Sequence, residues 1–217
     1  LEHVKKVYNH VKSNRNKSEY SKRRCDYAEY YKKCKVKNIV LYEAFAARGM
    51  LCSPYALFKE FMNRSDFDKY EHVWAIYDME DNEYIINKYK NVSNVRFVEF
   101  NSNEYLKALA EAKYIINNST FPGFVTKKDE QIYINTWHGI PLKTLGYDLP
   151  DANIAVANTM RNFLSADYLI SPNKFHSDIY LKAYKLDGLY EGTIIEEGQP
   201  RSDMIYHADR DEVIDQL

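Results

Sequence analysis

Residues 38–45 read NIVLYEAF, a short apolar run whose length and composition predict a buried β-strand. Ser53-Pro54 follows it and predicts a helix with a serine N-cap, a proline at the first helical position and an end near Asn63. Short apolar runs and helical stretches continue to alternate to about residue 196. Such alternation is typical of β-α-β units, so we expect an α/β fold with a mostly parallel sheet that helices cover on both faces.

Further apolar runs continue this pattern of strands along the chain. They are His72–Tyr77, Val95–Phe100, Lys113–Asn117, Gln131–Thr136, Asp167–Ile170 and Thr193–Glu196. Helices are expected between them, from about Asp81, from Ser102 as N-cap through Ala112, and from Ser171-Pro172 to about Tyr184.

The loops that follow the strands are the expected ligand-binding segments, because parallel sheets bind ligands at the carboxyl ends of their strands. Three such loops stand out, Ala46–Ser53, Asn118–Glu130 and Trp137–Gly146. None of them contains a GxGxxG or P-loop motif, so the sequence shows no self-contained nucleotide site.

The composition fits a globular chain with one sizeable core, since 45% of the 217 residues are hydrophobic and 28% are charged. No apolar run approaches the roughly 18 residues that a membrane-spanning helix needs. The start, Leu1-Glu2-His3, is neither a methionine nor a signal peptide, so we expect a cytosolic piece of a longer protein. Cys25, Cys34 and Cys52 lack CxxC spacing, which argues against a disulfide framework and a zinc site.

The first 37 residues are strongly basic, with a net charge of +8 against −9 for the remainder. They carry two apolar stripes at helical spacing, Val4, Val7, Tyr8 and Val11, then Tyr27, Tyr30, Tyr31 and Cys34. We therefore expect basic amphipathic helices before the α/β domain. Either the stripes dock on the domain and the lysines form a solvated face, or the basic surface meets anionic lipid head groups.

Residues 135–146, NTWHGIPLKTLG, contain the residues best suited to chemistry. His138 follows a predicted strand and can take up a proton near neutral pH. Gly139 allows a ligand to approach the backbone closely, and Lys143 can neutralise a phosphate. The alternative is that His138 has only a structural role and forms hydrogen bonds within a turn.

The run from Trp137 to Gly146, Trp-His-Gly-x-Pro-Leu-Lys-Thr-Leu-Gly, is similar to the signature of the CDP-glycerol:poly(glycerophosphate) glycerophosphotransferase family, of the teichoic-acid polymerase or primase type. Other segments resemble family segments in the same order, over about residues 38–205. They are Tyr42-Glu43-Ala44-Phe45, Asn117-Asn118-Ser119 with Phe121-Pro122, Ser171-Pro172-Asn173 and Gly198-Gln199-Pro200-Arg201-Ser202-Asp203.

The resemblance implies the N-terminal, acceptor-side half of a GT-B fold, in which two Rossmann-like domains face a cleft. Residues 1–37 would then be a basic helical segment, 38–203 the Rossmann-like acceptor domain, and 204–217 the start of a crossover to a C-terminal donor domain. The implied reaction transfers glycerol phosphate from CDP-glycerol to a hydroxyl of a lipid-linked acceptor and releases CMP. The chain alone is expected to be inactive.

The resemblance also assigns roles to residues. His138 would be the general base, and Lys143, Asn118 and Ser119 would hold acceptor phosphates. Thr136, Gly139 and Arg201 are the remaining substrate-binding candidates, and Arg201 and Asp203 would also brace the crossover between the domains.

The implied partners are CDP-glycerol, bound mainly by the other half, a lipid-linked polyol-phosphate or glycan acceptor, and an anionic membrane surface. The protein would lie peripherally on the cytoplasmic face of the bacterial membrane. No cofactor, metal or nucleic acid is expected. Two alternatives stay open, a ribitol-phosphate or other polyol-phosphate (capsule) transferase and a non-catalytic domain that binds an anionic polymer.

Overall fold

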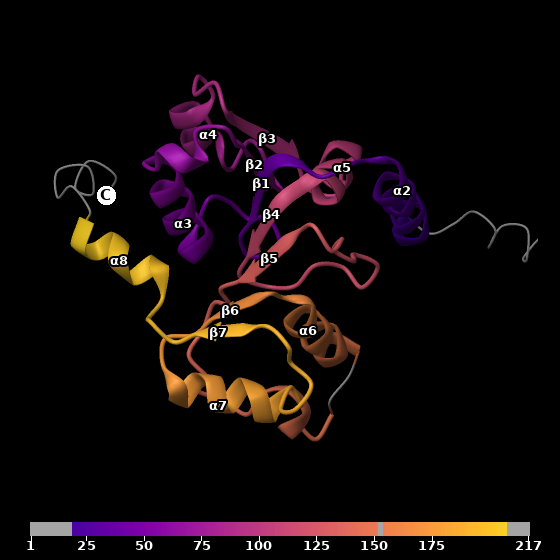
Figure 1. Cartoon of the computed structure of the whole chain (residues 1–217), viewed down its shortest axis with the longest axis vertical. Helices are drawn as coiled ribbons and strands as arrows, with labels where there is room; N and C mark the ends of the chain where they lie inside the picture. The colour runs from indigo at the N-terminus through magenta and orange to yellow at the C-terminus, as the bar shows by residue number, and fades with distance from the viewer. Residues whose placement is uncertain (1–18, 152–153, 208–217) are drawn as a thin grey trace, which may run out of the picture.

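The structure, a computed structural model, describes residues 19–151 and 154–207. Its centre is a parallel sheet of seven strands in the order β3-β2-β1-β4-β5-β6-β7 (Figure 1). The strands are β1 Lys37–Glu43, β2 Glu71–Ile76, β3 Val95–Glu99, β4 Ala112–Asn117, β5 Ile132–Asn135, β6 Tyr168–Ile170 and β7 Thr193–Ile195. Each strand overlaps a run that the sequence predicts, and the predicted α/β class with a parallel sheet is confirmed.

Helices lie before, between and after these strands. They are α2 Glu19–Lys33, α3 Cys52–Met62, α4 Glu83–Tyr89, α5 Asn103–Glu111, α6 Ile154–Ser165, α7 Lys174–Ala183 and α8 Pro200–His207, with short 3₁₀ turns η1 Ser65–Phe67 and η2 Gly146–Asp148. The first predicted amphipathic stripe, residues 4–11, lies outside the described residues.

Helix starts show where local sequence signals succeed and fail. Ser102 caps α5 as predicted, because its side chain accepts a hydrogen bond from the Tyr105 N–H. Ser53 does not cap α3, since the N-cap position is Leu51 and Ser53 is buried inside the helix. Asn173, rather than Ser171, caps α7.

Helix α6 is an element that the sequence pattern did not predict. It begins IAVANTMR, with β-branched and amide residues of modest helix propensity and no acidic residue in its first turn. Its burial of Phe163 against the domain supplies the stabilisation that these local signals lack.

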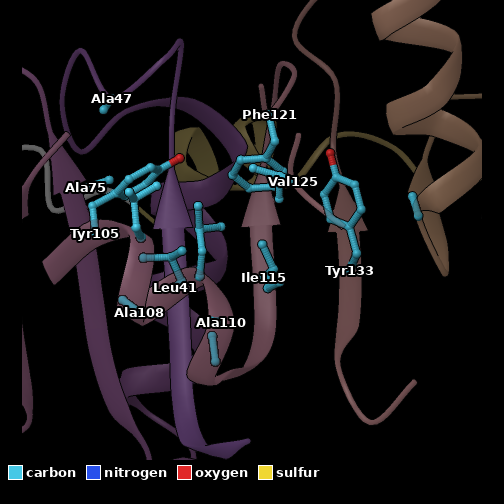
Figure 2. Packing of buried hydrophobic residues seen from close by; sticks show 14 of the residues in the cluster. Leu41, Ala47, Ala75, Tyr105, Ala108, Ala110, Ile115, Phe121, Val125 and Tyr133 are labelled. Carbon is cyan, nitrogen blue, oxygen red and sulfur yellow. The ribbon is translucent and has the colours of Figure 1, made fainter. Parts of the chain in front are cut away.

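Helices cover both faces of the sheet, as expected. Ile39 and Leu41 of β1 point into the cluster that contains residues of α5 and Tyr27 of α2, whereas Val40 and Tyr42 point into the cluster under α3 and α4. This two-sided burial explains why the strand is apolar at consecutive positions rather than alternating. Figure 2 shows part of the first cluster, with the phenol oxygens of Tyr105 and Tyr133 at the end of the sheet toward which the strand arrows point.

Some tyrosines place their hydroxyl groups inside the core. Tyr42 is fully buried, and its hydroxyl pairs with Nδ1 of the buried His72 at 2.9 Å. The Tyr133 hydroxyl is also buried and donates to Asn117 Oδ1 at 2.9 Å. These phenols bring hydrogen bonds, and not only apolar area, into the core.

The strand order creates a switch point between β1 and β4. From β1 the chain proceeds outward through β2 and β3, then crosses by α5 to β4 on the opposite side of β1 and proceeds to β7. Connections therefore leave the carboxyl ends of β1 and β4 in opposite directions, which opens a crevice where sheets of this kind bind ligands.

Helix α8 packs against α3 (Figure 1). The domain boundary predicted at residue 203 falls within this helix, and the division of the chain into domains stays a prediction. Among the described residues, no helix combines the length and apolar character needed to span a bilayer.

Candidate active site

Two loops meet above the switch point. The residues after β1 turn sharply, with left-handed φ angles at Phe45, Ala46 and Ala47. The Phe45 N–H donates to Oδ1 of Asn118, the first residue after β4, at 2.8 Å. This hydrogen bond joins the exits of β1 and β4, so the loops predicted to bind ligand do lie together.

His138 lies on the loop that leaves β5, next to this junction. Its ring stacks on Trp137 with 4.4 Å between centroids and lies 5.5 Å from the Phe45 ring. Trp137 in turn packs edge-on against Phe163 of α6 and Tyr184 after α7. An aromatic anchor therefore fixes the histidine between the β1 and β5 loops.

The surroundings of His138 keep its imidazole neutral near pH 7. Burial lowers the pKa of His138 below its usual value, and the positive charge of Arg201 lowers it further. A neutral imidazole has a lone pair that accepts a proton, which is the state a general base requires.

Arg201 ties three segments together at this point. Its Nη1 donates to the His138 backbone oxygen at 3.0 Å and lies 3.5 Å from Cys52 Sγ, while its backbone N–H donates to Ser53 Oγ at 3.4 Å. The guanidinium thus holds the His138 loop and the start of α3 against α8.

The other candidate residues that follow β4 and β5 are Thr136, Asn118 and Ser119, and their atoms are partly used in local hydrogen bonds. The Thr136 N–H donates to Asn117 O at 2.9 Å, and the Thr136 side chain is buried. Asn118 Nδ2 and Ser119 Oγ are buried and have no hydrogen-bond partner among the described residues. Buried polar atoms are rarely left unpaired, so these two mark positions where a hydrogen-bonding group fits.

The two glycines of the signature differ in role. A Cβ at Gly139 would meet nothing within 4 Å, and the Gly139 carbonyl accepts a hydrogen bond from Tyr180 at 2.9 Å. Gly146 has φ +60°, and a Cβ there would lie 2.3 Å from the Ala183 carbonyl oxygen. Gly146 is therefore required by packing, whereas Gly139 leaves open space beside His138. Lys143, between them, is exposed at the surface.

Several residues of this region escaped prediction from sequence. Glu43, the last residue of β1, is fully buried, and Tyr105 donates a hydrogen bond to its carboxyl. Burial raises the pKa of Glu43 to about 7. The available signal was a carboxylate at the end of an otherwise apolar strand.

Arg161 of α6 fixes the loop after β4, which the sequence marked for function. Its guanidinium donates to the carbonyl oxygens of Phe121, Pro122 and Val125 at 3.2, 2.9 and 2.7 Å. Much of the Asn118–Glu130 loop is thus held by structural contacts. In residues 19–151 and 154–207, no cluster of three or more His, Cys, Asp or Glu side chains is suited to a metal ion.

Comparison with known proteins places this chain in a family. The sequence model described as CDP-Glycerol:Poly(glycerophosphate) glycerophosphotransferase matches residues 18–217. The teichoic acid poly(glycerol phosphate) polymerase of Bacillus spizizenii is 31% identical over 81% of this chain and 44% of its own length. The polymerase of the same name from Staphylococcus epidermidis is 32% identical over 100% of this chain and 29% of its own length.

Solved structures agree with the sequence relatives. A histidine-to-asparagine variant of the wall teichoic acid polymerase TagF with CDPG has a TM-score of 0.74 and 28% identity, covering 98% of this chain and 51% of that chain. TagF without a named substitution has a TM-score of 0.71 and 27% identity, and the match covers 97% of this chain and 50% of the TagF chain. The chain spans less than half the length of the two curated relatives and about half of the solved chains.

Proposed function

The chain belongs to the CDP-glycerol:poly(glycerophosphate) glycerophosphotransferase family, and on that premise we propose that it forms the acceptor-side half of an enzyme that builds teichoic acid. The reaction transfers glycerol phosphate from CDP-glycerol to a hydroxyl of the growing acceptor. The observation that carries this proposal is the neutral, anchored His138 beside the switch point of the sheet.

In the proposed step, the acceptor hydroxyl oxygen attacks the phosphorus of the glycerol phosphate group. A new P–O bond forms, the bond to the CMP phosphate oxygen breaks, and CMP leaves. His138 takes the proton of the attacking hydroxyl, which is the role of a general base. Its fixed ring orientation reduces the cost of bringing the reacting groups into line.

Binding roles follow from what each side chain is free to touch. Lys143 is exposed on the same loop, five residues after His138, and can meet an acceptor phosphate. Asn118 and Ser119 offer buried polar atoms at the β4 exit. Arg201 already donates to the His138 backbone, so we assign it to positioning.

We also propose a lipid-linked acceptor and contact with the anionic cytoplasmic face of the membrane. Helix α2 buries Tyr27 against the domain, whereas Lys22, Arg24, Lys32 and Lys33 are exposed. Tyr27 of the second amphipathic stripe packs on the body, and the basic residues beside it face outward, where anionic head groups attract them.

The test is CMP release from CDP-glycerol by a full-length enzyme that contains this chain, with CDP-ribitol as the competing donor. Preference for CDP-ribitol would move the protein to the ribitol-phosphate alternative. If His138→Gln preserved turnover, the assigned mechanism would be wrong. Polymer binding without turnover by the full-length protein would favour the non-catalytic alternative. The 217-residue chain alone should release no CMP.

A further inference from the structure

A row of buried polar side chains crosses the carboxyl ends of the three central strands. In the parallel register, Glu43 of β1 pairs with Asn117 of β4, and Asn117 pairs with Asn135 of β5. Neighbouring positions in register project to the same face of a sheet, so the three side chains lie side by side. All three are fully buried.

The hydrogen bonds of this row lead toward the His138 loop. Asn135 Nδ2 donates to Asn117 Oδ1 at 3.0 Å, and Asn135 Oδ1 accepts from the Trp137 N–H at 2.9 Å. Trp137 has a left-handed φ of +46° and stacks on the His138 ring. Asn135 therefore holds the backbone of Trp137 in an unfavourable conformation that a free chain would leave.

The Glu43 end of the row is incompletely paired. Tyr105 donates to one carboxyl oxygen of Glu43, and the other, Oε1, has no partner among the described residues. Asn117 Nδ2 is also buried without a described partner. Asn117 Oδ1 already accepts from Asn135 and Tyr133, so the amide group is the unpaired end of Asn117, and the structure has no hydrogen bond between this group and Glu43 Oε1.

We propose that Glu43 is a positioning residue for His138 and acts through the buried row of Asn117 and Asn135. The protonated carboxyl of Glu43 can donate a hydrogen bond, whereas the carboxylate can only accept one. Gain or loss of the proton therefore changes the hydrogen bonding that Oε1 can offer to Asn117. The row transmits this change to Trp137 and hence to the ring stacked on it. A second route is covalent, through Ala44 to Phe45, whose ring also contacts His138.

The groups that face Glu43 favour a carboxyl that gains or loses its proton near pH 7. The titratable side chains around it are phenols, Tyr105 of α5 and Tyr133 of β5. The neighbouring cation, Arg161 of α6, interacts with Tyr133. Burial dominates and raises the pKa of Glu43 to about 7, while the hydrogen bond from Tyr105 lowers it.

The proposal rests on the proposed role of His138, but its test needs no substrate and so does not depend on the reaction. The indole N–H signals of the two tryptophans, Trp74 and Trp137, are followed by NMR between pH 5 and about pH 9. The protein is the full chain with His138→Gln, so that the histidine itself cannot titrate. Trp74 lies on the other face of the sheet and serves as an internal control.

We expect the Trp137 signal to shift with a midpoint near pH 7 while the Trp74 signal stays flat, and Glu43→Gln to abolish the Trp137 shift. The matched control is Glu111→Gln, which changes another buried glutamate, paired with Lys37 at 2.9 Å at the start of the sheet. It should leave the midpoint in place.

Three results would overturn the proposal: a flat Trp137 signal, a shift that survives Glu43→Gln, and an equal shift of Trp74. Tyr105→Phe gives an independent check if Glu43→Gln does not fold. It removes the hydrogen bond that favours the Glu43 carboxylate, so the midpoint must move to higher pH. An unchanged midpoint in that variant would also reject the role of Glu43.

Discussion

Arg201 donates a hydrogen bond to the backbone oxygen of His138 at 3.0 Å, although 63 residues separate them in the chain. The contact crosses from α8 to the loop after β5. It also brings a cation beside the imidazole, where it contributes to the lowered pKa of His138. One side chain therefore fixes the loop and favours the basic form of the histidine.

Removal of this contact should destabilise the fold. Arg201→Ala leaves the His138 carbonyl without its donor, and we expect the free energy of unfolding to fall by about 1–3 kcal/mol. Urea denaturation measures the change. The matched control is Arg64→Ala, whose pair with Asp66 is exposed to solvent and should contribute little to stability. Equal effects of the two substitutions would show that Arg201 does not act through His138.

The rate of transfer should depend on His138. In a full-length enzyme, His138→Gln should lower the rate of CMP release by about 10²–10⁴-fold, because the hydroxyl proton loses its acceptor. His176→Gln is the control, since this second histidine is held by Asn173 at the start of α7. It should retain a rate close to that of the unaltered enzyme, and comparable losses in both variants would mean that neither acts as the base.

The positions of the strands along the chain and the class of the fold could be predicted from local patterns, because each strand is a short apolar run that is recognisable by its own composition. The N-cap of α5 was equally local, a serine three residues before the N–H that it accepts. The start of α3 could not be predicted from such a local signal. Cys52 and Ser53 are held by Arg201, from a segment about 150 residues later, and no signal near Ser53 reveals that contact.

The candidate site shows the same division. His138 and its loop were visible as a motif after a strand. Glu43 and Arg161 were not visible in this way, since Glu43 meets Tyr105 across 62 residues and Arg161 meets Phe121 across 40. Such pairs exist only after the register of the sheet and the path of α6 are fixed, so sequence spacing alone cannot identify them.

Stability should fall in mild acid because of His72. Burial lowers the pKa of His72 in the folded protein to about 4. As pH decreases, His72 therefore becomes protonated in the unfolded chain before it does so in the folded protein. The contribution of neutral His72 is complete above about pH 6.5 and is lost as pH falls toward 4, by up to about 3 kcal/mol. Unfolding free energies measured by urea at several pH values test this.

Glu43 acts in the opposite direction over an overlapping range. Its raised pKa favours folding below its unfolded pKa and loses that contribution as pH rises through about 7. The His72 experiment is therefore performed in the Glu43→Gln protein, where stability should rise from pH 4 to 6.5. Adding His72→Phe should flatten that rise, and a slope that persists would remove His72 as its cause.

Membrane contact should depend on where the positive charges of α2 lie rather than on the net charge of the chain. The exposed side chains of α2 attract anionic head groups over about one Debye length, roughly 10 Å at 0.1 M salt. The chain should therefore sediment with vesicles that contain anionic lipid at low salt and be released as salt rises. Vesicles of neutral lipid should retain little of it.

Charge reversal at matched sites separates a specific surface from general attraction. Lys22→Glu, Arg24→Glu and Lys32→Glu together change the charge of the exposed side of α2, and this variant should stay in solution. The control reverses an equal number of exposed lysines near β2 and α4, namely Lys69, Lys88 and Lys90. Because both variants have the same net charge, only the first should lose binding if α2 meets the membrane. Equal losses would assign the attraction to net charge, and an unaltered chain that ignores anionic vesicles at low salt would leave these residues as an ordinary solvated face.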